Sequence, residues 1–302
     1  MPRIGLALGS GGAKGWAHIG VLEVLLEAGI RPAIITGTSA GALVGAAAAL
    51  DRLQALKKKV LGLNLRQILS ALEIRLSGGG IVSGRGIIRE LEAMGISGQV
   101  EELPVPFTAV ATDLLNGAEV WLRRGDLASA IHASIAIPGV IAPVRRDGRW
   151  LVDGGLVNPV PVSAARALGA DIIIAVALDQ DVSLRHRLPE EREDPLEALV
   201  DNLPRFLSTP LRRVLPQMTR RERSPGYADV VTSAIDIMQA HIARTRLAGE
   251  PPHVLIRPML PNIGTFDFDR GAEIIAAGRE AAQAALPHIH QIQGRMSQWL
   301  NG

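Results

Sequence analysis

Short, fully apolar segments alternate with longer segments of helical spacing along the chain. The segments that predict β-strands are Ile4–Leu8, Ala33–Thr36, Phe107–Ala111, Trp150–Val152, Asp171–Leu178 and Val254–Pro258. A strand with one solvent face would alternate apolar and polar residues, whereas continuous apolar runs are typical of parallel strands covered on both faces. The pattern therefore predicts an α/β protein with three layers, α/β/α, around a mainly parallel central sheet.

Helical spacing follows several of these strands. In Trp16–Ala28 apolar side chains recur at the helical period, and Gly29 supplies a stop at the C-terminal end. The segment Ala40–Leu50 consists largely of small residues, which allow a helix to pack closely on a sheet. Helical spacing returns in Asp229–Leu247 and Arg270–Leu286.

The segment Gln180–Gly226 differs from the rest of the chain. It is charged, it contains several prolines, and it has no strand pattern. We therefore predict a single domain over residues 1–302, with 180–226 as a variable helical insertion.

Two segments combine basic residues with apolar ones. Lys57–Leu76 opens with three lysines and predicts a core-packed helix, with a lid that opens toward lipid as the alternative. Leu203–Arg223 carries six arginines and one acid, Glu222, and predicts a solvated amphipathic face, with contact to anionic lipid as the alternative. The pattern alone leaves both alternatives open.

Composition narrows the classes of function. The chain has no cysteine, which excludes disulfides, a thiolate nucleophile and a cysteine-ligated metal, and we expect neither metal nor cofactor. With 32 basic and 30 acidic residues the net charge is only +2, so we expect no nucleic-acid partner. The apolar runs are shorter than the roughly 20 residues of a spanning helix. We expect a cytoplasmic protein that touches the inner membrane face at most peripherally; no pattern determines its oligomeric state.

The first candidate for chemistry is Gly37-Thr38-Ser39-Ala40-Gly41, which fits the Gly-x-Ser-x-Gly pattern of a nucleophile elbow. A serine on a sharp turn between a strand and a helix needs neighbours without bulk, and here an apolar strand precedes it and a helix follows. The alternative is a glycine-rich turn that caps a buried helix.

The second candidate is the glycine-rich loop Gly9–Gly15 after the first strand. A P-loop requires Gly-Lys-Ser/Thr, but Ala13 precedes Lys14 and Gly15 follows it, and the dinucleotide fingerprint also fails on spacing. The loop instead offers exposed backbone N–H groups at the start of a helix, which suit an anion or a developing oxyanion.

The third candidate is Asp153-Gly154-Gly155 at the end of a predicted strand. It is either an ordinary turn or, beside an elbow serine, the position of a general base. None of the seven histidines has so clear a strand-end setting, although His18 and His132 remain alternative partners for a serine.

In this order the three blocks resemble the patatin-like phospholipase family, in particular its compact bacterial members related to the catalytic domain of neuropathy target esterase. The similarity extends over Gly11–Gly15, Gly37–Gly41, Ala133–Val144 and Asp153–Gly155 and covers the 180–226 segment least. Ser10 departs from the pattern, since many members have a glycine there.

The resemblance implies a Ser–Asp dyad, with Ser39 as nucleophile and Asp153 as general base. It also implies an oxyanion hole made by the N–H groups of Gly11, Gly12 and Ala13. Supporting positions are Lys14, Gly37, Gly41, Gly154 and Gly155. An aspartate is a poor base in water and serves only in a partly dry site within reach of the hydroxyl.

The expected function is that of a serine lipid-acyl hydrolase that cleaves acyl esters through an acyl-enzyme. Three alternatives remain. An acyltransferase would use the same dyad, and an α/β-hydrolase with Ser, Asp and His would place more strands before its elbow than the one found before Ser39. A non-catalytic regulator would bind an anion or nucleotide at the glycine loop.

Overall fold

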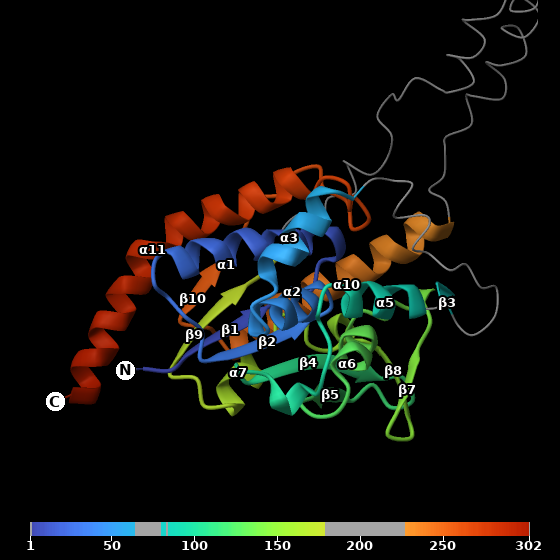
Figure 1. Cartoon of the computed structure of the whole chain (residues 1–302), viewed down its shortest axis with the longest axis horizontal. Helices are drawn as coiled ribbons and strands as arrows, with labels where there is room; N and C mark the ends of the chain where they lie inside the picture. The colour runs from blue at the N-terminus through green and yellow to red at the C-terminus, as the bar shows by residue number, and fades with distance from the viewer. Residues whose placement is uncertain (1, 64–79, 83, 179–226, 302) are drawn as a thin grey trace, which may run out of the picture. The chain divides into compact units, whose positions relative to one another are not determined.

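The computed structural model describes residues 2–63, 80–82, 84–178 and 227–301 (Figure 1). The chain divides into a larger unit, Met1–Asp181 with Ile237–Gly302, and a smaller unit, Val182–Asp236. The predicted insertion 180–226 falls largely within the smaller unit and itself lies outside the described residues, as does the predicted lipid-contacting segment 203–223.

The central sheet of the larger unit has the strand order β10-β9-β1-β2-β4-β8-β7, with β5 paired to β4. Its strands are β1 (Ile4–Leu8), β2 (Ile34–Thr38), β4 (Phe107–Asp113), β5 (Glu119–Leu122), β7 (Val144–Arg146), β8 (Arg149–Asp153), β9 (Ile172–Val176) and β10 (Val254–Ile256). Strands β10, β9, β1, β2 and β4 run parallel, and β5, β8 and β7 extend the sheet by antiparallel pairing. A small second sheet pairs β3 (Gly80–Val82) with β6 (Gly139–Ile141). The predicted mainly parallel sheet is confirmed.

The sheet is buried on both faces, which explains its continuous apolar strands. In β9 the side chains of Ile172, Ile174 and Val176 belong to one apolar cluster, whereas Ile173 and Ala175 belong to another. Successive strand residues point to opposite faces, so each cluster marks one covered face. The three-layer prediction is therefore confirmed.

Helices cover both faces of the sheet (Figure 1). On one side lie α1 (Ala17–Glu27), α2 (Ala40–Ala49), α3 (Leu53–Leu61), α6 (Leu127–Ser134) and α11 (Gly271–Asn301). On the other lie α7 (Val162–Ala167) and residues 237–249 of α10 (Tyr227–Gly249). The remaining elements are α5 (Arg85–Ala93) and the 3₁₀ turns η1 (Gly12–Trp16), η2 (Val100–Glu102) and η3 (Gly154–Leu156).

Two glycines let α1 and α11 lie in backbone contact. A Cβ atom on Gly20 would lie 2.0 Å from the carbonyl oxygen of Ile275, and one on Gly278 would lie 2.0 Å from that of Ala17. No side chain fits in such a space. The close approach holds α1, and with it the glycine loop that leads into α1, against the C-terminal helix.

Only residues 57–63 of the predicted segment 57–76 are described, and the helix α3 to which they belong is amphipathic. In α3 the side chains of Leu53, Leu56 and Val60 are buried, whereas Lys58 and Lys59 are exposed. Packing of α3 on the core fits the main prediction for its described part; residues 64–76 lie outside the described residues. Within the described ranges, no helix is long and apolar enough to cross a bilayer.

Candidate active site

Ser39 occupies a strained turn between β2 and α2. Its φ and ψ angles are 56° and −123°, a conformation that L-residues rarely adopt. The flanking glycines are required, because a Cβ on Gly37 would lie 2.4 Å from the oxygen of Gly41 and a Cβ on Gly41 would lie 2.1 Å from the oxygen of Leu8. The Gly-x-Ser-x-Gly pattern therefore has the steric role of a nucleophile elbow.

A second serine supports this turn from α6. The N–H of Ser39 donates a hydrogen bond to Oγ of Ser134 at 2.9 Å, and the Ser134 hydroxyl donates to the carbonyl of Val110 at 2.6 Å. All three groups are buried. Sequence reasoning missed Ser134, since nothing in the sequence links it to a residue ninety-five positions earlier.

Asp153 is brought to the Ser39 hydroxyl at the end of β8. Oγ of Ser39 donates to Oδ2 of Asp153 at 2.6 Å, and the N–H of Gly155 donates to Oδ1 at 2.7 Å. The backbone of Asp153 is held as well, since Thr112 donates its hydroxyl to the Asp153 carbonyl and the Asp153 N–H donates to Ala136. The carboxylate thus has one oxygen fixed by an amide and the other directed at the serine.

Burial gives this carboxylate unusual basicity. The Asp153 side chain is almost inaccessible, and burial raises its pKa from 3.8 to about 6, although the bonds from Ser39 and Gly155 favour the charged form. At neutral pH the group is still ionised, and it accepts a proton more readily than an exposed aspartate does.

The glycine loop is anchored by its ends and leaves its centre open. The N–H of Gly9 donates to Val176 at 3.0 Å, and the N–H of Ser10 donates to Pro159 at 2.8 Å. Gly11 and Gly12 have φ angles of 157° and 56° and are only half-buried. Among the described residues, neither of their N–H groups has a hydrogen-bond partner.

The N–H group of Ala13 was expected to be a third donor to the oxyanion, but the structure gives it another partner. It donates to the carbonyl of Thr265 at 2.9 Å, so in this structure it is not free to bind a developing oxyanion. The sequence could not reveal this, because Thr265 arrives from a loop more than two hundred residues away. Lys14, the next residue, is buried in η1.

The glycine loop and the elbow are in direct contact. A Cβ on Gly15 would lie 2.2 Å from Cβ of Ala40, the residue that follows Ser39. The half-buried amides of Gly11 and Gly12 are therefore carried on a turn that packs against the first residue of α2. Gly154 is required similarly, because its Cβ would lie 2.2 Å from the oxygen of Val110.

The two alternative histidine partners do not bond to Ser39. Nε2 of His18 lies 2.8 Å from the oxygen of Gly9, and complete burial lowers the His18 pKa to about 4, so the ring is neutral. His132 is packed against Gly84, and burial also lowers its pKa. His18 supports the glycine loop, and Asp153 is the partner of the serine hydroxyl.

Gln239 of α10 is a further residue that the sequence did not single out. The Ser10 hydroxyl donates to its Oε1 at 3.0 Å, and its amide packs against Gly155 so closely that a Cβ there would lie 2.6 Å from Nε2. One side chain thus links the loop that carries the open amides with the turn that carries Asp153. Among the residues described, no cluster of three or more His, Asp or Glu side chains has the arrangement of a metal site.

Comparisons with known proteins identify the family of the chain. A family model described as patatin-like phospholipase matches residues 6–166. An uncharacterized NTE family protein of Mycobacterium tuberculosis (strain H37Rv) is 36% identical to this chain. The match covers 94% of this chain and 91% of that protein. The lysophospholipase NTE1 of Pyricularia oryzae is 29% identical over 97% of this chain, which corresponds to 19% of that protein.

The crystal structure of VipD from Legionella pneumophila is also similar, with a TM-score of 0.40 and 13% identity over 95% of this chain and 67% of that one. The family match and the relative of similar length confirm the resemblance carried by the three sequence blocks. The chain belongs to the patatin-like phospholipase family.

Proposed function

We propose that this protein is a serine hydrolase that cleaves acyl esters of lipids through a Ser39–Asp153 dyad. The observation that carries the proposal is the 2.6 Å hydrogen bond from Oγ of Ser39, on a strained turn, to a buried carboxylate. Membership of the patatin-like phospholipase family, with a lysophospholipase among the relatives, supports lipid hydrolysis as the class of reaction.

In the first half of the reaction Ser39 attacks the carbonyl carbon of the ester. Asp153 takes the hydroxyl proton on Oδ2 as the new C–O bond forms, which gives a tetrahedral intermediate with a negative oxygen. When the intermediate collapses, the bond to the alcohol breaks and Asp153 returns the proton to the leaving oxygen. The products are the free alcohol, such as a lysolipid or glycerol derivative, and an acyl group on Ser39.

The second half of the reaction repeats these steps with water. Asp153 takes a proton from a water molecule as its oxygen attacks the acyl carbon, and then gives the proton to Oγ of Ser39 as the acyl bond breaks. The fatty acid leaves and the dyad is restored. An alcohol in place of water would make the protein an acyltransferase with the same residues.

We assign the oxyanion hole to the N–H groups of Gly11 and Gly12. Support comes from their lack of a partner among the described residues and from the packing of their turn against Ala40. One such donor is worth roughly 3 kcal/mol of transition-state stabilisation in comparable hydrolases. With these donors in place, a carboxylate of modest basicity is a sufficient base.

The test is turnover of a panel of phospholipids, lysophospholipids and short-chain p-nitrophenyl esters by the wild type, Ser39→Ala and Asp153→Asn. Ser97→Ala and Asp51→Asn are matched controls at exposed positions. We expect hydrolysis by the wild type and both controls, and its loss in the two dyad variants while circular dichroism stays native. Near-normal turnover by Asp153→Asn would contradict the dyad, and transfer of the acyl group to an added alcohol in preference to water would identify an acyltransferase.

A further inference from the structure

Exposed apolar side chains of the larger unit gather at one end of the sheet. Ser39 follows the carboxyl end of β2, and the segments that continue beyond the parallel strands lie at this same end. Apart from Leu61, the exposed large apolar residues described in this unit lie in these segments, at the start of β8, or on α10 next to Gln239, which contacts Ser10; they are Leu114, Leu115, Trp150, Ile237, Met238, Met259 and Phe266. Large apolar side chains gathered at one face of a protein mark an interaction surface.

A concentration of arginine borders this end. We call it the arginine rim; it consists of Leu114, Leu115, Trp150, Arg145 and Arg149, from the β4–β5 turn and the β7–β8 hairpin, and of Arg123 and Arg124, which follow β5 and run back along β4 because β5 is antiparallel to it. All seven side chains are exposed, and Leu115 retains 78% of its accessible surface.

The leucines are held outward by the backbone. The N–H of Leu114 donates to the carbonyl of Trp150 at 2.8 Å, and the N–H of Leu115 donates to Oδ1 of Asp113 at 3.0 Å. The first bond ties the β4–β5 turn to β8, the second ties it to the last residue of β4, and together they order the backbone that carries two adjacent apolar side chains. Their exposure is therefore a property of an ordered turn.

The positive charge of the rim is only partly compensated. Within the described ranges, Arg123, Arg124 and Arg145 have no ion pair, and Nε of Arg149 makes a long contact of 3.9 Å with Asp113. Among the nearby carboxylates, Glu119 pairs with Arg246 at 3.0 Å, and Asp147 lies 3.9 Å from Arg146. Backbone hydrogen bonds lower the pKa of Glu101, and the nearby charge of Arg124 contributes to a smaller extent.

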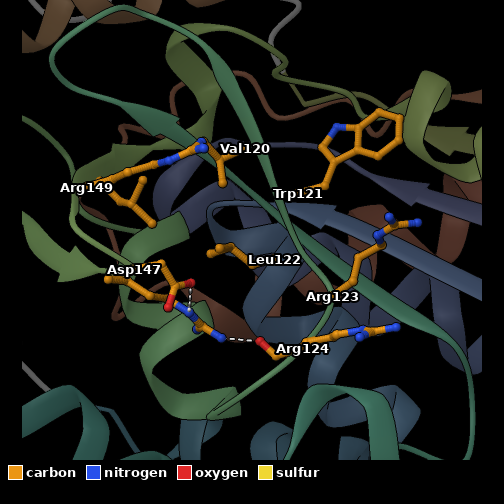
Figure 2. Close-up of a pocket in the computed structure, with 9 residues that line it drawn as sticks. Val120, Trp121, Leu122, Arg123, Arg124, Asp147 and Arg149 are labelled. Atoms are coloured by element: carbon orange, nitrogen blue, oxygen red, sulfur yellow. Dashed lines mark hydrogen bonds and ion pairs between the residues drawn. The ribbon is translucent and has the colours of Figure 1, made fainter.

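Three residues of the rim, Arg123, Arg124 and Arg149, help to line a cavity of about 550 Å³. Figure 2 shows Arg123, Arg124 and Arg149 extending from its wall, with Val120 and Leu122 between them. The fourth arginine of the wall, Arg146, is already bonded to the carbonyl of Arg124 and lies 3.9 Å from Asp147. The cavity thus combines an apolar floor with guanidinium groups that are free to take an anion.

Two of the arginines lie over aromatic rings. The guanidinium carbon of Arg145 is 6.0 Å from the ring centre of Trp150, and that of Arg123 is 5.9 Å from the ring centre of Trp121. Tryptophan beside arginine is typical of side chains at the boundary between lipid headgroups and acyl chains.

The rim lies close to the dyad. Trp150 precedes Asp153 by three residues on the same strand, a separation of about 10 Å at the usual rise per residue. On β4, Ala111 lies opposite Asp153, and Leu114 follows three residues later, beyond the carboxyl end. A surface bound by the rim would therefore lie within the length of one lipid from Ser39.

We propose that the arginine rim docks the protein on an anionic lipid bilayer, with Leu114, Leu115 and Trp150 entering the interface and the arginines binding lipid phosphates. This inference rests on the proposed function, because docking on a membrane would bring lipid substrates to the Ser39–Asp153 dyad. The guanidinium groups favour phosphate through charge-assisted bonds, and the leucine pair favours a bilayer over a free anion. The rim differs from the two basic segments, 57–76 and 203–223, predicted from the sequence.

The test measures vesicle binding separately from catalysis. The full chain carrying Ser39→Ala is sedimented with vesicles of phosphatidylcholine mixed with phosphatidylglycerol and with vesicles of pure phosphatidylcholine. We expect binding to the anionic vesicles that weakens as salt rises. Replacing Arg124→Gln and Arg149→Gln together should weaken it by about 25-fold, at about fivefold per arginine, and Leu114→Ser with Leu115→Ser by about tenfold or more.

The matched control is Leu61→Ser with Arg31→Gln. Leu61 has the same 51% exposure as Leu114 but lies on α3, and Arg31 is exposed in the segment before β2, outside the rim. This control should bind like the parent chain. Equal binding by rim variants and control, equal binding to neutral and anionic vesicles, or self-association of the chain through the rim without vesicle binding would each overturn the proposal.

Turnover of a soluble p-nitrophenyl ester keeps the two proposals apart. In the active background the rim variants should hydrolyse this ester at the wild-type rate and lose turnover only of lipids in anionic vesicles. Absence of ester turnover by the wild type would refute the proposed function, whereas vesicle binding by the Ser39→Ala chain would still test the rim alone.

Discussion

Ser39 lies beside Asp153 because their strands meet end to end along one edge of β4. Thr38, the last residue of β2, lies opposite Val110, and Asp153, the last residue of β8, lies opposite Ala111. Strand β5 occupies the other edge of β4 over the same residues. The chain leaves the sheet at both strand ends, which points the hydroxyl and the carboxylate into one buried space.

The pH dependence of catalysis should report the buried base. Asp153 must be ionised to accept the proton of Ser39, and burial raises its pKa to about 6. We expect kcat/KM for a soluble ester to be constant above neutral pH and to fall tenfold per pH unit below about pH 6. A profile that stays flat down to about pH 4, the range of an ordinary aspartate, would contradict this environment.

The same burial should make the wild type less stable than an uncharged variant. A carboxyl whose pKa is higher in the folded state than in the unfolded state binds its proton more tightly when folded. Folding is then disfavoured by ionisation as pH rises through the interval from 3.8 to about 6.

Asp153→Asn should therefore unfold at a higher temperature than the wild type near pH 8, by up to roughly 3 kcal/mol of stability, and this advantage should vanish near about pH 4. Thermal unfolding of both proteins across this range is the measurement. A variant that is less stable at every pH would show that the amide does not fit between Ser39 and Gly155.

Ser134→Ala should damage the elbow without removing a reacting group. It leaves the buried N–H of Ser39 without its acceptor, a loss of about 1–3 kcal/mol of stability. We expect a lower kcat at nearly unchanged KM, because the turn is mispositioned while substrate contacts remain. Ser129→Ala, on the same helix, is the control. Equal kcat values for the two variants would contradict the role of Ser134 in positioning the Ser39 turn.

Gly12→Ala tests the oxyanion loop. A Cβ on Gly12 would lie 2.4 Å from the oxygen of Thr265, and φ is 56°, so the loop has to shift. Loss of one donor in such a hole lowers kcat by about 100-fold or more. Gly29→Ala is a matched control, since φ is 75° there and nothing lies within 4 Å of the added Cβ. The two variants should suffer similar backbone strain, and comparable kcat values would place the donors elsewhere.

The sequence predicted those parts of the fold that depend on local pattern. Continuous apolar runs identified the buried strands, and glycines around Ser39 identified a turn that no larger residue allows. The antiparallel pairing of β5 and β8 with β4, and of β7 with β8, was not predicted, because strand direction depends on pairing between distant segments. The apolar segments 107–111 and 150–152 were identified as strands, but β5 and β7 were not.

The supporting contacts of the site were beyond sequence reasoning for the same reason. Ser134 and Gln239 each make their contact with residues far away in the chain; Ser134 lies in the similar block Ala133–Val144, but nothing in that block singled it out. The bond from Ala13 to Thr265 is likewise set by the packing of a distant loop. A site residue can be predicted from sequence when its neighbours in the chain determine its backbone conformation. A residue whose role depends on contacts with distant segments cannot.

The central claim is that Ser39 is the nucleophile and that Asp153 activates it. The most direct measurement is labelling of the intact protein with a serine-reactive fluorophosphonate, followed by mass-spectrometric location of the modified residue in the wild type, Ser39→Ala and Asp153→Asn. The account predicts one adduct on Ser39 in the wild type, none in Ser39→Ala and much slower labelling in Asp153→Asn. An adduct on another serine, or unchanged labelling of Ser39→Ala, would contradict it.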